Sequence, residues 1–171
     1  MHLELGSVSL CQDSDRKVWS LSHEVNYKNR LPTRLNFSVR GMEIENISCQ
    51  VCGAFVESLD HLLFDCNLAK ELWIKVKIWV DMDVYRDSSS WAAWVSWFDS
   101  RQANSDSKIK LYVIVASLLW HNWRFRNSKL FGSNSMKKVF IFYSVRSFSF
   151  NWLCNRGRFK IRRVDWLMKP L

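Results

Sequence analysis

The sequence predicts a mostly α-helical protein in which a small turn module packs on a helical extension. Apolar residues recur at helical spacing from about residue 67 onward. A cluster of soft side chains around residues 49–66 precedes them and predicts a separate turn-rich module. The chain of 171 residues is 48% hydrophobic and 15% aromatic, with ten tryptophans, which is enough apolar surface for a stable core. This composition excludes wholesale disorder.

The turn module carries four side chains that typically bind a soft metal ion. Cys49 and Cys52 form a Cys-x2-Cys pair, and His61 and Cys66 complete the pattern C-x2-C-x8-H-x4-C. Four protein ligands leave no position for water, which is typical of one structural Zn²⁺. We therefore expect a zinc-knuckle-like module that is folded by its metal. The alternative is three buried cysteines acting as small hydrophobic residues beside a core histidine.

The segments before the metal ligands are short. Residues 1–30 are polar and weakly patterned. Residues 31–48 predict a short helix and a turn, with Pro32 in the first helical turn, Thr33 as a nearby cap and Gly41 at the end. Gly53 follows the second thiol, where a tight turn favours a residue that readily adopts positive φ.

A helix is predicted to begin with Asn67 as its N-cap. Its buried face should contain residues at i, i+4, i+8 and i+11, widened by one further tryptophan: Leu68, Leu72, Val76, Trp79 and Trp73. After a polar connector, residues 91–98 predict a second short helix. A long helix follows from about Lys108 to Leu130, with Gly132 as its stop signal.

Two further segments complete the chain. Residues 136–153 are periodic but rich in β-branched and aromatic residues, so their pattern fits either a helix or a strand. A basic tail covers residues 156–163. We thus divide the chain into an N-terminal segment (1–30), a metal-binding domain (31–82) and a basic, aromatic-rich helical extension (83–171).

The charge is strongly segregated along the chain. The net charge is +9, yet residues 1–100 hold 10 basic and 14 acidic side chains, whereas residues 101–171 hold 15 and 2. Such a basic block indicates a polyanionic partner, most simply RNA or DNA contacted through phosphates. The alternative is a solvated basic surface, or one whose acidic partner region lies elsewhere.

Cysteine usage and hydropathy indicate an intracellular protein, nuclear or cytoplasmic. The five cysteines are an odd number, and no signal peptide is recognisable, so a secreted disulfide framework is not expected. The longest apolar stretch, residues 111–120, is too short to span a bilayer. No membrane association is expected.

Several motifs in order resemble a known family. They comprise Leu31-Pro32-Thr33-Arg34, the Cys49-x2-Cys52-Gly53 turn, Glu57-Ser58-x2-His61-Leu62-x3-Cys66 and Ala69-x3-Trp73, followed by Trp120-x2-Trp123-x2-Arg126-Asn127-x3-Phe131. This order resembles the zinc-binding domain at the C-terminal end of plant LINE-type (non-LTR) reverse transcriptases. A strand at residues 18–22, before the zinc domain, also fits the resemblance.

The resemblance implies an accessory role beside an RNA-directed DNA polymerase, in which the domain helps to engage template RNA or target DNA. Another protein of the same retroelement is a further possible partner. The chain itself is not expected to be an enzyme, because it lacks the Tyr/Phe-x-Asp-Asp signature whose aspartates hold the metal ions of a polymerase, and its pair Asp81-x-Asp83 lies in a polar connector. Two alternatives stay open: a protein–protein interaction module with a structural zinc, and a degenerate retrotransposon remnant.

The candidate nucleic-acid contacts combine the basic tail with two arginines beside aromatic residues of the long helix. Trp120, Trp123 and Phe131 have the helical spacing of core residues, and base stacking is the alternative. The Arg–Asn pair of the family pattern favours a polar role, although a cation near a helix C-terminus also complements the helix dipole. The candidates are Arg124, Arg126, Arg156, Arg158, Lys160, Arg162 and Arg163.

Overall fold

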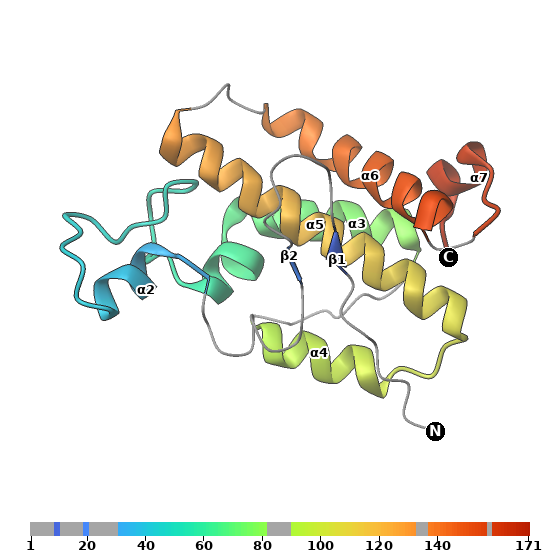
Figure 1. Cartoon of the computed structure of the whole chain (residues 1–171), viewed down its shortest axis with the longest axis horizontal. Coiled ribbons are helices and arrows are strands. Elements are labelled where there is room, and N and C mark those ends of the chain that lie inside the picture. The colour runs from blue at the N-terminus through green and yellow to red at the C-terminus, as the bar shows by residue number, and fades with distance from the viewer. Residues whose placement is uncertain (1–8, 11–18, 21–30, 82–89, 133–136, 157–158) are drawn as a thin grey trace.

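A computed structural model describes residues 9–10, 19–20, 31–81, 90–132, 137–156 and 159–171 (Figure 1). The described chain is predominantly helical, which confirms the predicted class. Two-residue strands β1 (Ser9–Leu10) and β2 (Trp19–Ser20) pair antiparallel, and β2 falls within the strand expected at residues 18–22. The helical elements are α2 (Arg34–Val39), η1 (His61–Asp65), α3 (Asn67–Val80), α4 (Trp91–Ser100), α5 (Ser105–Phe131), η2 (Lys138–Phe140), α6 (Ile141–Arg156) and α7 (Arg163–Met168).

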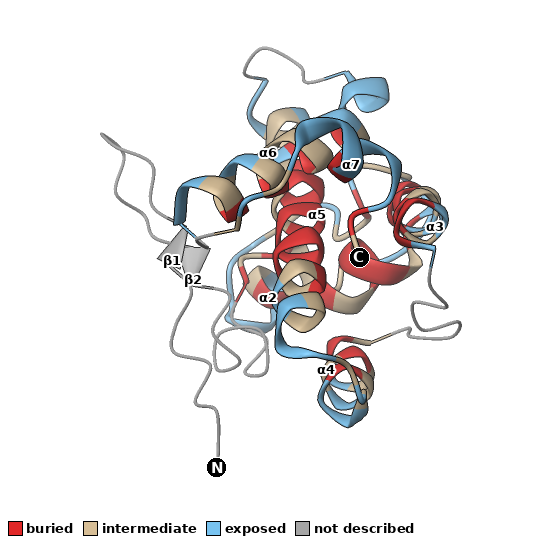
Figure 2. Cartoon of the chain, turned by 90° about the vertical axis from the view of Figure 1, so that its right-hand side faces the viewer, coloured by how far each residue is buried: buried red, intermediate tan, exposed pale blue. Residues whose placement is uncertain are grey.

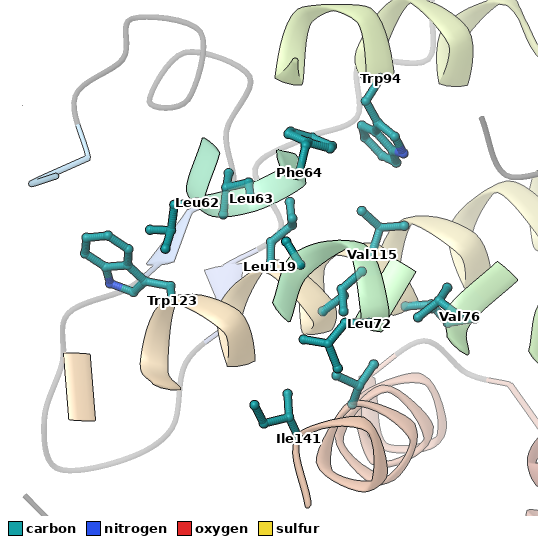
Figure 3. Close-up of a cluster of buried hydrophobic side chains, with 14 of the residues drawn as sticks. Leu62, Leu63, Phe64, Leu72, Val76, Trp94, Val115, Leu119, Trp123 and Ile141 are labelled. Atoms are coloured by element: carbon teal, nitrogen blue, oxygen red, sulfur yellow. The ribbon is translucent and has the colours of Figure 1, made fainter. Parts of the chain in front are cut away.

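Helix α5 lies in the middle of the described helices, with α3, α4 and α6 around it (Figure 2). Thirteen of its residues are buried, on more than one face, because it has neighbours on several sides. Figure 3 shows side chains from η1, α3, α4, α5 and α6 meeting in one cluster. The metal-ligand region and the helical extension therefore share a continuous core. The predicted boundary between residues 82 and 83 lies outside the described residues.

The ends of α5 follow from its terminal residues. Asn104 is the N-cap, and its side chain accepts a hydrogen bond from the backbone N–H of Ser107 at 2.7 Å. Gly132 ends the helix with φ of 66°, a left-handed conformation that glycine adopts without steric cost. The stop at Gly132 is confirmed, whereas the helix begins three residues before the predicted start at Lys108.

Residues 141–156 form a helix, which settles the choice left open by the sequence. The buried residues of α6 recur every four positions along one face, and this stripe packs against α5. Tertiary packing thus outweighs the β-propensity of its Phe and Val residues. The stripe consists of Ile141, Val145, Ser149 and Leu153.

The predicted buried face of α3 is confirmed for Leu68, Leu72, Val76 and Trp79, while Trp73 is only half-buried. Helix α3 begins one residue earlier than an Asn67 cap implies, because Cys66 occupies the cap position. Cys66 makes no capping hydrogen bond with its side chain.

The second short helix is confirmed as α4. Ser90 caps it by accepting from the backbone N–H of Ala93 at 3.3 Å. Trp91, Trp94 and Phe98 stack on one another with centroid distances of 5.2 Å, which gives the helix one continuous aromatic face.

The end of the chain is fixed by Trp166 of α7. This side chain is fully buried, and its indole N–H donates to the carbonyl of Arg146 at 3.0 Å. Trp79 of α3 donates in turn to the carbonyl of Trp166 at 3.1 Å, and the two rings meet edge to face at 5.4 Å. Part of the predicted basic tail is therefore the start of a docked helix.

We predict that Trp166→Ala lowers the free energy of unfolding by about 3–5 kcal/mol, because it leaves a cavity between α3, α6 and α7. Urea unfolding followed by circular dichroism measures the change. Val164→Ala on the exposed side of α7 is the matched control, since Val164 is 71% exposed. Equal stability of the two variants would contradict the anchoring role of Trp166.

Candidate metal centre

A short hairpin carries the first two ligands. Ser48 and Val56 form an antiparallel bridge, and the N–H of Cys49 donates to the carbonyl of Phe55 at 2.7 Å. The turn closes when the N–H of Gly53 donates to the carbonyl of Cys49 at 2.8 Å, with φ of Gly53 at 71°. The glycine predicted to adopt positive φ does so, and both thiols lie on this one turn.

The π-helical turn η1 carries the other two ligands. Its start is held by the hydroxyl of Ser58, which accepts from the N–H of His61 at 3.0 Å. It closes when the N–H of Cys66 donates to the carbonyl of His61 at 2.7 Å, an i→i+5 hydrogen bond. This wider turn keeps His61 and Cys66 on the same side of the module.

The four predicted ligands come together as one cluster. The ligand atoms of Cys49, Cys52, His61 and Cys66 all lie within 4.8 Å of one another, and Cys52 Sγ is 3.3 Å from His61 Nε2. In a tetrahedral zinc site the ligand atoms are separated by about 3.5–3.8 Å. Within the described part of the chain this is the one group with such geometry. The cluster is suitable for one zinc ion.

The electrostatics of the thiols favour a cation. A hydrogen bond between Cys49 and Cys66 and the burial of Cys49 raise the pKa of the Cys49 thiol to about 12. The same hydrogen bond lowers the pKa of Cys66. A buried pair of thiolates is costly without a counter-charge, so Zn²⁺ would take the place of the proton between them. With all four positions filled by protein, the metal would be structural.

The hairpin and η1, which together form the metal module, are hydrogen-bonded to the helices around them. Asp60 Oδ1 accepts from the backbone N–H of Trp91 at 3.0 Å and so supports the start of α4. On α3, Trp73 Nε1 donates to the carbonyl of Leu63 at 2.9 Å. On α5, Asn122 Nδ2 donates to the carbonyl of Leu62 at 2.7 Å. The carbonyls of η1 are thus satisfied partly by tertiary contacts.

Arg126 does not fit its predicted role as a phosphate contact. Its side chain is only 2% exposed and forms an ion pair with Glu57, whose side chain is fully buried. Its Nε lies 3.1 Å from each carboxylate oxygen, and its Nη1 donates to Asn127 Oδ1 at 2.9 Å. The prediction for Arg126 was wrong because a partner far along the chain satisfies the guanidinium.

The other predicted basic residues lie at the surface where the structure describes them. Arg124, Arg156, Lys160, Arg162 and Arg163 are all exposed. Arg162 pairs with Asp165 at 2.7 Å, and the Arg163 guanidinium lies 5.9 Å from the Phe150 ring. The prediction for Arg158 lies outside the described residues.

The aromatic residues of the family-like segment divide between core and surface. Trp123 is buried as a core residue, Trp120 is half-buried, and Phe131 is 72% exposed, against the core interpretation. Sequence reasoning also missed Glu57 and Asn122 as residues that support the site. An acid between the two ligand pairs, Glu57, and an arginine within the long helix, Arg126, were the available signals, whereas nothing in the sequence pointed to Asn122.

The fold and the cluster together define a zinc-binding module supported by helices. Residues 17–73 match a family model described as zinc-binding in reverse transcriptase. All four predicted ligands lie within this match, which covers the metal module and the first half of α3. No curated protein and no solved structure matches the chain. None of the described helices is long and apolar enough to cross a membrane.

We predict that the purified protein binds about one Zn²⁺ per chain and that Cys52→Ser abolishes stoichiometric binding, because a tetrahedral site loses one of its four ligands. Metal analysis by mass spectrometry measures the content. Cys154→Ser is the matched control, since Cys154 lies on α6 and outside the cluster. Equal zinc in the Cys52→Ser and Cys154→Ser proteins would contradict the assignment.

Proposed function

We propose that this chain is a zinc-stabilised accessory module that binds RNA or DNA mainly through phosphates. The observation that carries the proposal is the charge segregation, with 15 basic and 2 acidic side chains in residues 101–171. Cations at this density attract phosphates and gain free energy from counterion release. The metal would supply folding free energy, on the order of 10 kcal/mol, and no chemistry.

The exposed cations support this proposal. Lys160, Arg162 and Arg163 lie at or just before α7, whose position is fixed by the buried Trp166. Arg156 ends α6 nearby in sequence, and Arg124 is exposed on α5. Cations held on docked helices bind phosphate with a smaller entropic cost than cations on a free tail.

We further propose that the parent protein is a plant LINE-type reverse transcriptase and that this chain has no polymerase activity of its own. The order of motif blocks from Leu31 to Trp73 supports the first part, as does the segment from Trp120 to Phe131, which lies beyond the matched residues. The sequence has no Tyr/Phe-x-Asp-Asp motif, which supports the second part. Another protein of the same retroelement would be a natural partner.

A protein-interaction module is the second candidate function. Exposed apolar side chains favour it, among them Ile74 and Ile78 on the outer side of α3 and Phe140 and Tyr143 near the start of α6. The two functions differ in their salt dependence, because phosphate contacts weaken steeply as salt rises.

We predict that the double variant Arg162→Glu/Arg163→Glu weakens binding to RNA and DNA alike and reduces the salt slope by about two units, one per lost phosphate contact. Fluorescence anisotropy with unrelated oligonucleotides between about 50 and 200 mM salt measures the slope. Zinc content should stay unchanged.

The matched control is Lys70→Glu/Lys77→Glu on α3, which changes the net charge by the same amount outside the basic block. It should retain most of the affinity. Equal losses in both double variants, or binding that is insensitive to salt, would contradict the proposal and favour the protein-interaction module.

A further inference from the structure

Glu57 lies where three parts of the fold meet. It follows the hairpin that carries Cys49 and Cys52, and its backbone N–H donates to the carbonyl of Ile47 at 2.8 Å. Its carboxylate accepts from the backbone N–H of Arg34 at 3.0 Å, at the first residue of α2. The second carboxylate oxygen lies 3.5 Å from the backbone nitrogen of Gln50, between the two cysteines of the turn. One buried side chain thus contacts both the base and the tip of the ligand hairpin.

Arg126 is the counter-charge that makes this burial possible. Its Nε and Nη2 both donate to the Glu57 carboxylate, and its guanidinium carbon lies 4.9 Å from the centroid of the Trp123 ring. A fully buried carboxylate without such a partner would be strongly destabilising. The two residues are 69 positions apart, so α5 determines where the carboxylate sits.

Helix α5 holds the other half of the metal module as well. Asn122 precedes Arg126 by one helical turn, and its side-chain amide donates to the carbonyl of Leu62, the residue after His61. Arg126 therefore acts on the hairpin that carries the thiols, through Glu57. Asn122 contacts η1, which carries the imidazole of His61. This arrangement fixes the separation of the two ligand pairs independently of the metal.

We propose that Glu57 and Arg126 are positioning residues of the metal site, through which α5 preorganises the four ligands. Neither residue touches the metal. The carboxylate orients the Cys49–Cys52 turn through Gln50, and Arg126 orients the carboxylate. Preorganisation raises affinity because less conformational freedom is lost on binding. Metal affinity then depends on a residue of the helical extension, outside the segment that matches the zinc-binding family.

The test measures metal affinity and ligand geometry separately from stability. We expect Arg126→Met and Glu57→Gln to weaken Zn²⁺ binding by about 10–100-fold, the range found for residues that orient metal ligands. Competition with a chromophoric chelator measures the affinity. In the Co²⁺-substituted protein, the visible absorption bands should shift and lose intensity, because they report the tetrahedral geometry of the thiolates and the imidazole.

Two further variants keep the proposal testable if a single variant folds poorly. Arg126→Lys retains the charge with one donor group in place of the guanidinium fork, so its affinity should lie between those of wild type and Arg126→Met. The double variant Glu57→Gln/Arg126→Met removes both buried charges, so its melting temperature should recover. Its affinity should stay low, because a glutamine amide cannot accept with both atoms from the N–H groups of Arg34 and Gln50.

Val145→Ala is the matched control for stability. Val145 is fully buried on α6, which carries no metal ligand, so this change should lower the melting temperature and leave Zn²⁺ affinity within about twofold of wild type. Equal losses of affinity in Val145→Ala and Arg126→Met, together with an unchanged Co²⁺ spectrum, would overturn the proposal. The ion pair would then stabilise the fold without positioning the ligands.

Discussion

The buried ion pair between Glu57 and Arg126 is the constraint on which the rest of this structure depends. Placing two charges in an apolar core is costly, and the cost is offset only when both are fully hydrogen-bonded. Here the carboxylate accepts from Arg126 and from the backbone of α2, and it also faces the ligand turn. The hairpin, α2 and α5 can therefore adopt one mutual arrangement without leaving a charge unpaired. An apolar contact of the same size would tolerate several arrangements, because apolar packing has no comparable directionality.

A bound metal and the hydrophobic core would stabilise different parts of the metal module. Residues 40–56 contribute Cys49 as their one buried residue, so the hairpin has little apolar surface with which to fold. A structural zinc would hold this hairpin to η1, which is itself well buried through Leu62, Leu63 and Phe64. From η1 onward the core is continuous into α3, α4, α5 and α6. The stability of the hairpin thus depends on the metal, whereas the stability of η1 depends on tertiary packing.

The parts that sequence predicted well are those encoded by local spacing. The four ligands lie within 18 residues, and their cluster follows from a turn and one wide helical turn. The buried face of α3 and the stop at Gly132 are likewise local features. The burial of Arg126 could not be predicted in the same way, because it depends on a carboxylate 69 positions away. Nor could the helical state of residues 141–156, since only packing against α5 selects helix over strand.

The segregation of charge also has an intramolecular consequence. Among the described residues, three ion pairs join an acid of residues 1–100 to a base of residues 101–171: Glu57–Arg126, Glu71–Lys138 and Asp81–Lys169. Lys138 and Lys75 both hydrogen-bond to Glu71 and lower the pKa of its carboxyl group.

The acidic half of the chain is thus one partner of the basic half, and cations such as Arg126 form ion pairs within the fold. An external polyanion would depend on exposed cations such as Arg124, Arg156, Lys160 and Arg163, together with Arg162, whose pair with Asp165 lies at the surface. Net charge alone therefore overstates the surface available to nucleic acid, and the burial and pairing of each cation decide which of them are available for phosphate contacts.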